Sequence, residues 1–403
     1  MHVIAELSGT VKHYDWGGYH FIPALLAMPN EKNLPFAEYW LGIHPQADCR
    51  VLLPTGEERL LGDYFTTASP SAMGDYVARR FETMPYLLKV LDVKDMLSIQ
   101  VHPSKDDAAR DHAIESERGV PLDAPHRNYK DENHKPELMV AMGDFWLLHG
   151  FKPAEVLKKS LLEVPELKHL EPVFTRSGYR GLYREVMEMP QEKVNAQLEP
   201  LLQRIIPLYK AGKLEKFTAD FWAARAALTF SKTGSIDRGI FSVYFFNLVQ
   251  LSRGQAVFQD AGVPHAYLEG QNVEIMASSD NVLRGGLTNK HIDVPELLKH
   301  IRFEETRPVV IKGEKHEQEI IYKTPAPDFE LSSFKLHQGD SISFTPTTAE
   351  ILLLVDGEVE ISNHESGIIL KQGHPSAILF PGHLARITSR QPSWLFRASV
   401  PQP

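Results

Sequence analysis

The segment at residues 97–103, LSIQVHP, constrains the fold more than any other stretch of this chain. Side chains on a β-strand alternate between two faces, so Ser98, Gln100 and His102 share one face and the apolar residues between them share the other. A strand with one apolar face usually turns its polar face to water. Taken alone, the segment favours an outward-facing strand, but two later segments favour a functional site.

Two further polar side chains stand where an apolar run begins. Glu137 follows a polar turn and opens the run 138–142, and His265 follows the Gly-Val-Pro turn at 262–264. A carboxylate that faces inward needs a partner. Gln100, His102, Glu137 and His265 could together form a metal site of nitrogen and oxygen donors. Two imidazoles and one carboxylate suit zinc, although a glutamine is an uncommon zinc ligand and spacing alone would not select it.

Four segments resemble the type I mannose-6-phosphate isomerases. They are YDWG at 14–17, SIQVHP at 98–103, YKDENHKPE at 129–137 and the long segment PHAYLEGQNVEIMASSDNVLRGGLTNKHIDVPEL at 264–297. The similarity is strong over the first ~150 residues and over 240–310, and weak elsewhere. The resemblance implies one zinc ion, with ligands that correspond to Gln100, His102, Glu137 and His265. One carboxylate against Zn²⁺ leaves a net charge of +1, which suits an open, Lewis-acidic site.

The expected fold is mainly β, with two cupin-like jelly-roll barrels and an α-helical insertion domain. A discontinuous catalytic domain spans 1–150 and 236–310, a helical domain spans 151–235, and a second cupin-like domain spans 311–403. Helical periodicity predicts helices at 154–162, 194–205 and 219–228, with Pro200 a potential break in the second. Further helices are expected at 75–81, after an N-cap at Ser104, and at 296–301. Asp356-Gly357 predicts a two-residue hairpin turn.

Composition narrows the class of partners and the compartment. The 403-residue chain has a net charge of −9 and no long basic run, so nucleic acid is not an expected partner. No segment has the length and apolarity of a membrane span, and the first residues lack the pattern of a secretory signal. The single cysteine, Cys49, fits a reducing compartment. We therefore expect a cytoplasmic protein, and the resemblance implies an enzyme that binds a phosphosugar and is expected to be a monomer.

The reaction that the resemblance implies interconverts mannose 6-phosphate and fructose 6-phosphate through an enediol. Such a reaction needs a base that carries a proton and positive charge near the developing enediolate oxygens. Arg284 matches the catalytic arginine of the family and is expected to act as a fixed cation and hydrogen-bond donor, since guanidinium rarely releases its proton. The alternative for Arg284 is a structural salt bridge with Asp280.

The remaining substrate contacts are less defined. Glu274 and Lys135 are the candidate bases, and Tyr267 shares a strand face with His265 two residues away. Lys290 and Ser98 are candidates for binding the phosphate, which requires cations or hydrogen-bond donors. The alternatives are structural: an ion pair between Glu137 and Lys135, a His265 bonded only to backbone, a half-buried core tyrosine at 267, and a solvated lysine at 290.

Three other functions compete with this interpretation. Two histidines and one carboxylate also occur in non-haem iron oxygenases, but the glutamine and the nearby Arg284 and Lys135 favour an isomerase. Glucose 6-phosphate as the substrate is compatible with the same residue types. A sugar-phosphate binding protein on the same scaffold would lack Arg284 or the base, and both are present here.

Overall fold

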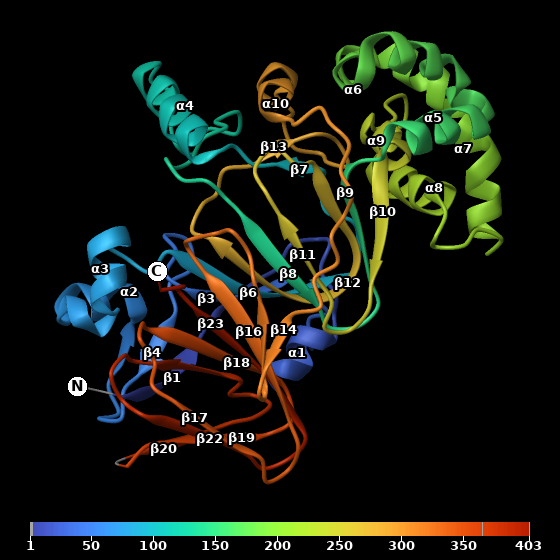
Figure 1. The fold of residues 1–403 in the computed structure, drawn as a ribbon. Helices are drawn as coiled ribbons and strands as arrows, with labels where there is room; N and C mark the ends of the chain where they lie inside the picture. Colours follow the sequence, from blue (N-terminus) through green and yellow to red (C-terminus); the bar gives the residue numbers. More distant parts are fainter. Residues whose placement is uncertain (1–2, 365, 403) are drawn as a thin grey trace.

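Antiparallel sheets and helices build the molecule. The computed structural model describes residues 3–364 and 366–402, which form three sheets, of ten, nine and four strands. Figure 1 shows the helical segment, drawn in green, at one end of the fold and the strands of the last hundred residues, drawn in orange and red, at the other. The strands that carry the metal-ligand candidates lie between these two parts.

The ten-stranded sheet positions the candidate residues. Its strands run in the order β10, β9, β12, β6, β3, β2, with β7, β8, β11 and β13 joined at the side. Their bounds are Phe246–Leu251 (β10), Phe145–Phe151 (β9), His265–Ala277 (β12), Tyr86–Val93 (β6), Glu38–Gly42 (β3), Thr10–Lys12 (β2), Gln100–Val101 (β7), Glu137–Ala141 (β8), Ala256–Gln259 (β11) and Leu283–Arg284 (β13). The long strand β12 pairs with β6, β7, β8 and β9, so residues from four separate segments converge along it.

Strands of the last hundred residues form two facing sheets, and the early strands β1, β4 and β5 extend one of them. One sheet runs β14, β15, β16, β23, β18, β21, β1, β4, β5 and the other runs β17, β22, β19, β20. The bounds are Glu314–His316 (β14), Glu319–Tyr322 (β15), Glu330–Leu336 (β16), Ser393–Ser399 (β23), Glu350–Asp356 (β18), Ser376–Leu379 (β21), Ile4–Ser8 (β1), Arg50–Leu52 (β4), Glu58–Leu60 (β5), Ser341–Phe344 (β17), Ala385–Ser389 (β22), Val359–Ser362 (β19) and Gly367–Leu370 (β20). A compact set of buried apolar side chains, among them Leu352, Ile361 and Leu395, fills the space between the sheets.

The prediction of a hairpin at Asp356-Gly357 is wrong, because the strands on either side of it do not pair with each other. A tight turn is present, with Gly357 at φ +90, but β18 pairs with β21 and β23 while β19 pairs with β20 and β22. The turn therefore carries the chain from one sheet to the other. A dipeptide sets the local backbone path, whereas the choice of partner strand depends on distant segments.

The segment 151–235 is helical, as expected. Its helices are α5 (Ala154–Glu163), the 3₁₀ helix η2 (Pro165–Leu170), α6 (Glu171–Glu188), α7 (Gln191–Lys210) and α8 (Ala219–Phe230), and α9 (Gly239–Phe245) leads back to β10. Pro200 lies inside α7 and does not end it. The apolar faces of these helices share one core with Ile99, Val101 and Leu268 of the ten-stranded sheet, so the helical segment packs directly beneath the candidate site.

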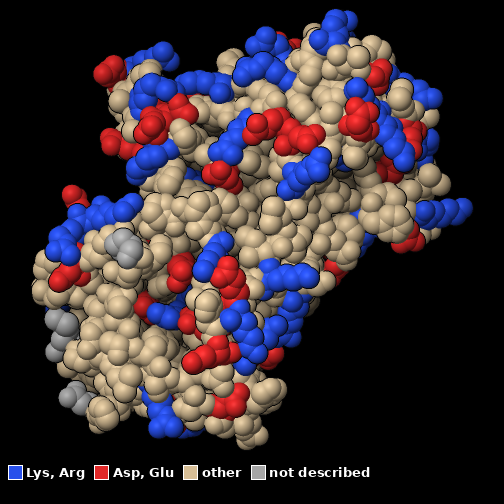
Figure 2. Space-filling model, viewed as in Figure 1, with Lys and Arg blue, Asp and Glu red and all other residues tan. Residues whose placement is uncertain are grey.

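The remaining helices flank the sheets. They are α1 (Phe21–Leu25), α2 (Leu61–Thr67), the 3₁₀ helix η1 (Pro70–Ala72), α3 (Asp75–Phe81), α4 (Lys105–Glu117) and α10 (Val294–His300). The Ser104 hydroxyl accepts a hydrogen bond from Asp107 N, which confirms the expected N-cap of α4. Among the described residues, no helix has the length and apolar character needed to cross a membrane. Figure 2 shows Lys and Arg side chains interspersed with Asp and Glu over the face in view.

Candidate active site

Three of the expected metal ligands converge at one end of the ten-stranded sheet. His102 Nε2 lies 3.5 Å from Glu137 Oε1, and His265 Nε2 lies 3.3 Å from Glu137 Oε2. All three residues are buried, and their ligand atoms lie within 4.8 Å of one another. Glu137 is the first residue of β8 and His265 the first of β12, so both side chains stand where a turn enters a strand.

Gln100 is brought to the same place by strand pairing. It lies directly opposite His265 in the antiparallel pairing of β7 with β12, and directly opposed residues have their side chains on the same face. Its side chain is half-buried and lines the cleft described below. The four expected ligands therefore belong to one cluster.

The hydrogen bonds of the two histidines orient their rings for a cation. His102 Nδ1 donates to Asn281 O at 2.8 Å and His265 Nδ1 donates to Val263 O at 3.0 Å, because a carbonyl can only accept. Both rings turn Nε2 toward Glu137, and His102 Nε2 is buried with no hydrogen-bond partner among the described residues. Burial lowers the pKa of His102 to about 4, against the opposing effect of Glu137. A backbone carbonyl that fixes the tautomer is typical of metal-binding histidines.

A cleft of about 810 Å³ opens over this cluster. Its walls come from five parts of the chain: 14–46, 87–100, 130–135, 229–230 and 276–290. Of the expected substrate residues, Ser98, Lys135, Arg284 and Lys290 line the cleft. Tyr267 and Glu274 lie beneath its wall and are buried. The polar face of segment 97–103 thus faces this cleft instead of open solvent.

Arg284 has no carboxylate partner among the described residues. Asp280, the alternative partner expected from sequence, instead contacts His44 at 3.3 Å between Oδ2 and Nε2. Neither Arg284 nor the Lys290 ammonium forms a side-chain hydrogen bond or ion pair with any described residue. Partial burial lowers the pKa of Arg284, and partial burial together with the charge of Arg284 lowers the pKa of Lys290. Two neighbouring cations without an anionic partner indicate a site for an anion.

Lys135 forms the ion pair with Glu137 that sequence reasoning named as an alternative. Its ammonium lies 3.1 Å from Glu137 Oε1. Burial alone would raise the pKa of Glu137, but Lys135 and then His102 lower it well below its ordinary value. The carboxylate is therefore ionised and available as a ligand, and its contact with Lys135 is compatible with that role.

Sequence reasoning missed a buried charge network next to the cluster. Lys89 on β6 lies directly opposite both Glu274 on β12 and Trp40 on β3. Its ammonium is 3.8 Å from Glu274 Oε1, 3.4 Å from Glu38 Oε2 and 4.5 Å from the centre of the Trp40 ring. The signal in the sequence is a single lysine in the middle of the apolar run 85–92.

The network continues from Glu274 to Tyr267. The Tyr267 hydroxyl donates to Glu274 Oε2 at 2.7 Å. Burial, with a further contribution from the negative charge of Glu137, raises the pKa of Glu274 to about 7. Burial and the adjacent Glu274 raise the pKa of Tyr267 well above its ordinary value. Glu274 is thus a carboxylate that can take up and release a proton near neutral pH.

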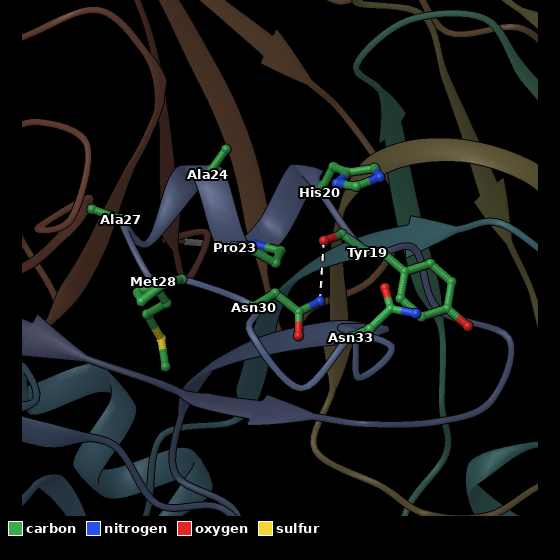
Figure 3. A pocket seen from close by; sticks show the side chains of 9 residues that line it. Tyr19, His20, Pro23, Ala24, Ala27, Met28, Asn30 and Asn33 are labelled. Atoms are coloured by element: carbon green, nitrogen blue, oxygen red, sulfur yellow. Dashed lines mark hydrogen bonds between the residues drawn. The ribbon is translucent and has the colours of Figure 1, made fainter.

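Another hollow, of about 490 Å³, lies at α1 (Figure 3). It is lined by Tyr19, His20 and otherwise by small, apolar and amide side chains, and the Asn30 amide donates to Tyr19 O at 3.2 Å. Its lining contains no lysine, arginine or carboxylate. The charged side chains Lys135, Arg284 and Lys290 line the cleft over Glu137 and not this hollow.

Comparisons with known proteins agree with the site. Residues 4–154 match the model of the catalytic domain of type I phosphomannose isomerase. The chain is 32% identical to the mannose-6-phosphate isomerase of Escherichia coli K12 over 96% of this chain and 99% of that protein. It is 31% identical to the human mannose-6-phosphate isomerase over 93% of this chain and 97% of that protein.

A solved structure of high similarity is the mannose-6-phosphate isomerase of Salmonella typhimurium bound to fructose 6-phosphate and zinc. That structure superimposes with a TM-score of 0.89 and 30% identity, and the match covers 99% of this chain and all of that one. Identity above 30% across nearly the whole length of the E. coli protein, together with the matching fold, assigns the family. This chain belongs to the type I phosphomannose isomerases.

Proposed function

We propose that the protein is a zinc-dependent aldose–ketose isomerase that interconverts mannose 6-phosphate and fructose 6-phosphate through an enediol. The observation that carries the proposal is the pairing of a cation site with an anion site in one cleft. The Nε2 atoms of His102 and His265 face Glu137, and the unpaired cations Arg284 and Lys290 line the same cleft. The family relatives, named as mannose-6-phosphate isomerases, support the same conclusion.

His102, His265, Glu137 and Gln100 would hold the zinc ion. Two neutral imidazoles, one carboxylate and one amide oxygen fit zinc, and the buried, unpartnered Nε2 of His102 is left to bind it. When bound, zinc supplies positive charge that polarises the oxygens of the sugar next to the breaking C–H bond. Lys135 lies on the cleft side of Glu137, where it can donate hydrogen bonds to the same oxygens.

Arg284, Lys290 and Ser98 would bind the anionic parts of the substrate. Lys290 stands at the exposed rim of the cleft and Ser98 is half-buried in its wall, so both can reach a phosphate. Arg284 is closer to the metal ligands, because it pairs with Gln100 across β13 and β7. The guanidinium therefore lies where it can donate hydrogen bonds to the enediolate oxygens while staying protonated.

Glu274 is our candidate for the proton carrier. In the open-chain sugar the C2–H bond breaks, its electrons form the C1=C2 bond of the enediol, and O1 gains a proton. The proton then returns to C1 while O2 loses its own, which yields the ketose. A carboxylate with a pKa of about 7 suits a general base, and the Tyr267 hydroxyl and Lys89 orient Glu274. Lys135 is the alternative carrier.

We propose two jelly-roll barrels as the fold that supports this site. The strand order β16-β23-β18-β21 facing β17-β22-β19-β20 supports the barrel within 311–403. The convergence of β6, β7, β8 and β9 on β12 supports the barrel within 1–150 and 236–310, with 151–235 as a helical domain. A monomer in a reducing cytoplasm is compatible with the single buried cysteine, Cys49. Light scattering after size exclusion tests the monomer.

The decisive experiment follows fructose 6-phosphate formation from mannose 6-phosphate. The purified protein is assayed as isolated, after a chelator has removed its metal, and after zinc has been restored. Activity that is lost with the metal and regained with zinc is the expected result. Zinc-loaded protein without isomerase activity would contradict the proposal. An oxygen-consuming reaction after loading with Fe²⁺ would then point to a cupin oxygenase, and tight sugar-phosphate binding without turnover to a binding protein.

A further inference from the structure

The loop between β13 and α10 holds two cations that repel each other. Arg284 begins the loop and Lys290 lies six residues later, and neither has an anionic partner among the described residues. The charge of Arg284 contributes to the lowered pKa of Lys290, so the two side chains repel each other electrostatically. A loop with this charge needs other contacts to keep both side chains in place.

The sheet holds the Arg284 end of this loop. Leu283 and Arg284 pair with β7, Gly285 N donates to Ile99 O at 2.9 Å, and Ile99 N donates to Gly286 O at 3.0 Å. These backbone contacts tie Arg284 to β7 and do not involve Asp237.

The Lys290 end has no strand partner and depends on one carboxylate. Asp237 Oδ1 accepts from Leu287 N at 2.8 Å, and Asp237 Oδ2 accepts from Thr288 N at 3.2 Å. Leu287 has φ +52, a left-handed conformation that a leucine rarely adopts. The Thr288 hydroxyl then accepts from Lys290 N at 3.1 Å, which extends the contact to the backbone that carries the Lys290 side chain.

Asp237 is in turn fixed by the helical segment. Its backbone nitrogen donates to the Ser231 hydroxyl at 3.2 Å, and the preceding Ile236 N donates to Asn195 Oδ1 on α7 at 2.9 Å. The backbone at Gly239 also lies against the backbone of the loop, because a Cβ on Gly239 would lie 2.6 Å from Leu287 N. The carboxylate is therefore presented by a rigid support and not by a free surface loop.

A second contact from the helical segment covers the loop. A Cβ on Gly285 would lie 2.7 Å from the Tyr183 hydroxyl of α6, so that hydroxyl fills the space that a larger residue would need. Gly285 and Gly286 could have loosened the loop, but the helical segment packs against it at both Gly285 and Leu287.

We infer that Asp237 is a positioning residue through which the helical segment places Lys290 against the phosphate of the substrate. The inference rests on the proposed function. It gives the helical segment a role in substrate binding. Because β7 holds Arg284 independently, loss of Asp237 acts on Lys290 and leaves the chemistry at Arg284 in place.

The test compares steady-state kinetics of Asp237→Ala and Asp237→Asn with the unmodified zinc-loaded enzyme. Misplacement of a binding group lowers affinity, so we expect KM for mannose 6-phosphate to rise about tenfold or more in Asp237→Ala while kcat stays within about threefold. Asp237→Asn keeps one acceptor oxygen, so its KM should lie between those of the unmodified enzyme and Asp237→Ala. Asp237→Asn is the variant to rely on if Asp237→Ala does not fold.

Asp220→Asn is the matched control. Asp220 is a half-buried carboxylate of the helical segment that accepts hydrogen bonds from Tyr244 and Arg204, but it does not contact the loop. Its KM should stay at the value of the unmodified enzyme. The double variant Asp237→Ala, Lys290→Ala should have the same KM as Lys290→Ala alone, since one residue acts through the other.

Two results would overturn the inference while the proposed function stands: an unchanged KM in both Asp237 variants, or a loss of kcat that matches or exceeds the effect on KM. Additive effects in the double variant would overturn it as well. A zinc-loaded, unmodified protein without isomerase activity would instead refute the proposed function, and with it the inference.

Discussion

Gln100 and His265 face each other directly across strands β7 and β12. The pairing places an amide beside an imidazole that turns Nε2 to Glu137. The Gln100 amide forms no side-chain hydrogen bond with any described residue, so its oxygen is free to bind a cation. The structure therefore gives a geometric reason for a ligand that spacing in the sequence could not select.

Replacing Gln100 tests that reason. Gln100→Leu removes the oxygen donor and keeps a side chain of similar size, so we expect the zinc dissociation constant to rise at least about tenfold, since even indirect partners of a metal contribute that much. Competition with a chromophoric chelator measures it. Gln46→Leu is the control, because Gln46 lies at the exposed rim of the same cleft and its loss should leave zinc affinity unchanged. Equal zinc affinity in both variants would remove Gln100 from the ligand set.

Much of the site was predictable because it follows from local pattern and family motifs. The alternation at 97–103, the turns before Glu137 and His265, and the loop after Asp280 all predicted side chains that the structure brings into one cleft or its wall. The missing part depends on strand register. In the sequence, Lys89 is only a single charged residue within an apolar strand. Its part in the buried charge network follows from its position opposite Glu274 and Trp40.

Dependence on distant strands also limited how much of the fold could be predicted. The N-cap at Ser104 and the helix at 75–81 are local features, and both were predicted correctly. The turn at Gly357 was also recognised, but the partners of β18 and β19 were not, because they are set by strands far away in the chain. Asp237 was missed for a related reason: its partners, Leu287 and Thr288, lie some fifty residues further along.

Arg284 should be needed for turnover and not for metal binding. Arg284→Ala removes a fixed cation beside the developing enediolate charge, so we expect kcat/KM to fall by about 10²-fold or more while zinc content is unchanged. Arg284→Lys keeps the charge but loses the planar fork, and should recover only part of the loss. Steady-state rates and metal analysis of the same preparations measure both. Full activity in Arg284→Ala would exclude a catalytic role.

Glu274 should set the acidic limb of the pH–rate profile. As a base it must be ionised, so kcat/KM falls as the pH drops through its pKa, which lies at about 7. Zinc offsets the negative charge of Glu137, which places the limb in the loaded enzyme between the ordinary value of 4.5 and about 7. Glu274→Gln should lose the limb and about 10²-fold or more of the activity. A limb that persists in Glu274→Gln would exclude Glu274 as the proton carrier.

Lys89 should stabilise the fold as well as the site. Its ammonium is buried between Glu38 and Glu274, and removing one partner of a buried ion pair leaves uncompensated charge. Lys89→Met should therefore lower the free energy of unfolding by about 3 kcal/mol. Lys94→Met, one residue beyond the same strand and exposed, is the control and should stay within about 0.5 kcal/mol. Urea unfolding of both variants measures these changes. Equal stability of Lys89→Met and Lys94→Met would show that apolar packing can replace the charge network.

His149 should make the protein sensitive to acid. It is buried beneath the metal ligands and donates from Nδ1 to Gln259 Oε1 at 2.7 Å. Burial, with a contribution from His265, lowers the pKa of His149 from 6.5 to about 4, so between these values the unfolded chain binds the proton and the native protein does not. The contribution of His149 to the free energy of unfolding is fully present above pH 6.5. It decreases by about 3 kcal/mol as the pH falls toward 4.

The free energy of unfolding, measured against pH on metal-free protein, should fall less steeply with decreasing pH in His149→Gln. His383→Gln, a change on the exposed surface, should keep the original slope. Equal slopes in the two variants would show that His149 is protonated in the native protein and that its burial does not limit stability in acid.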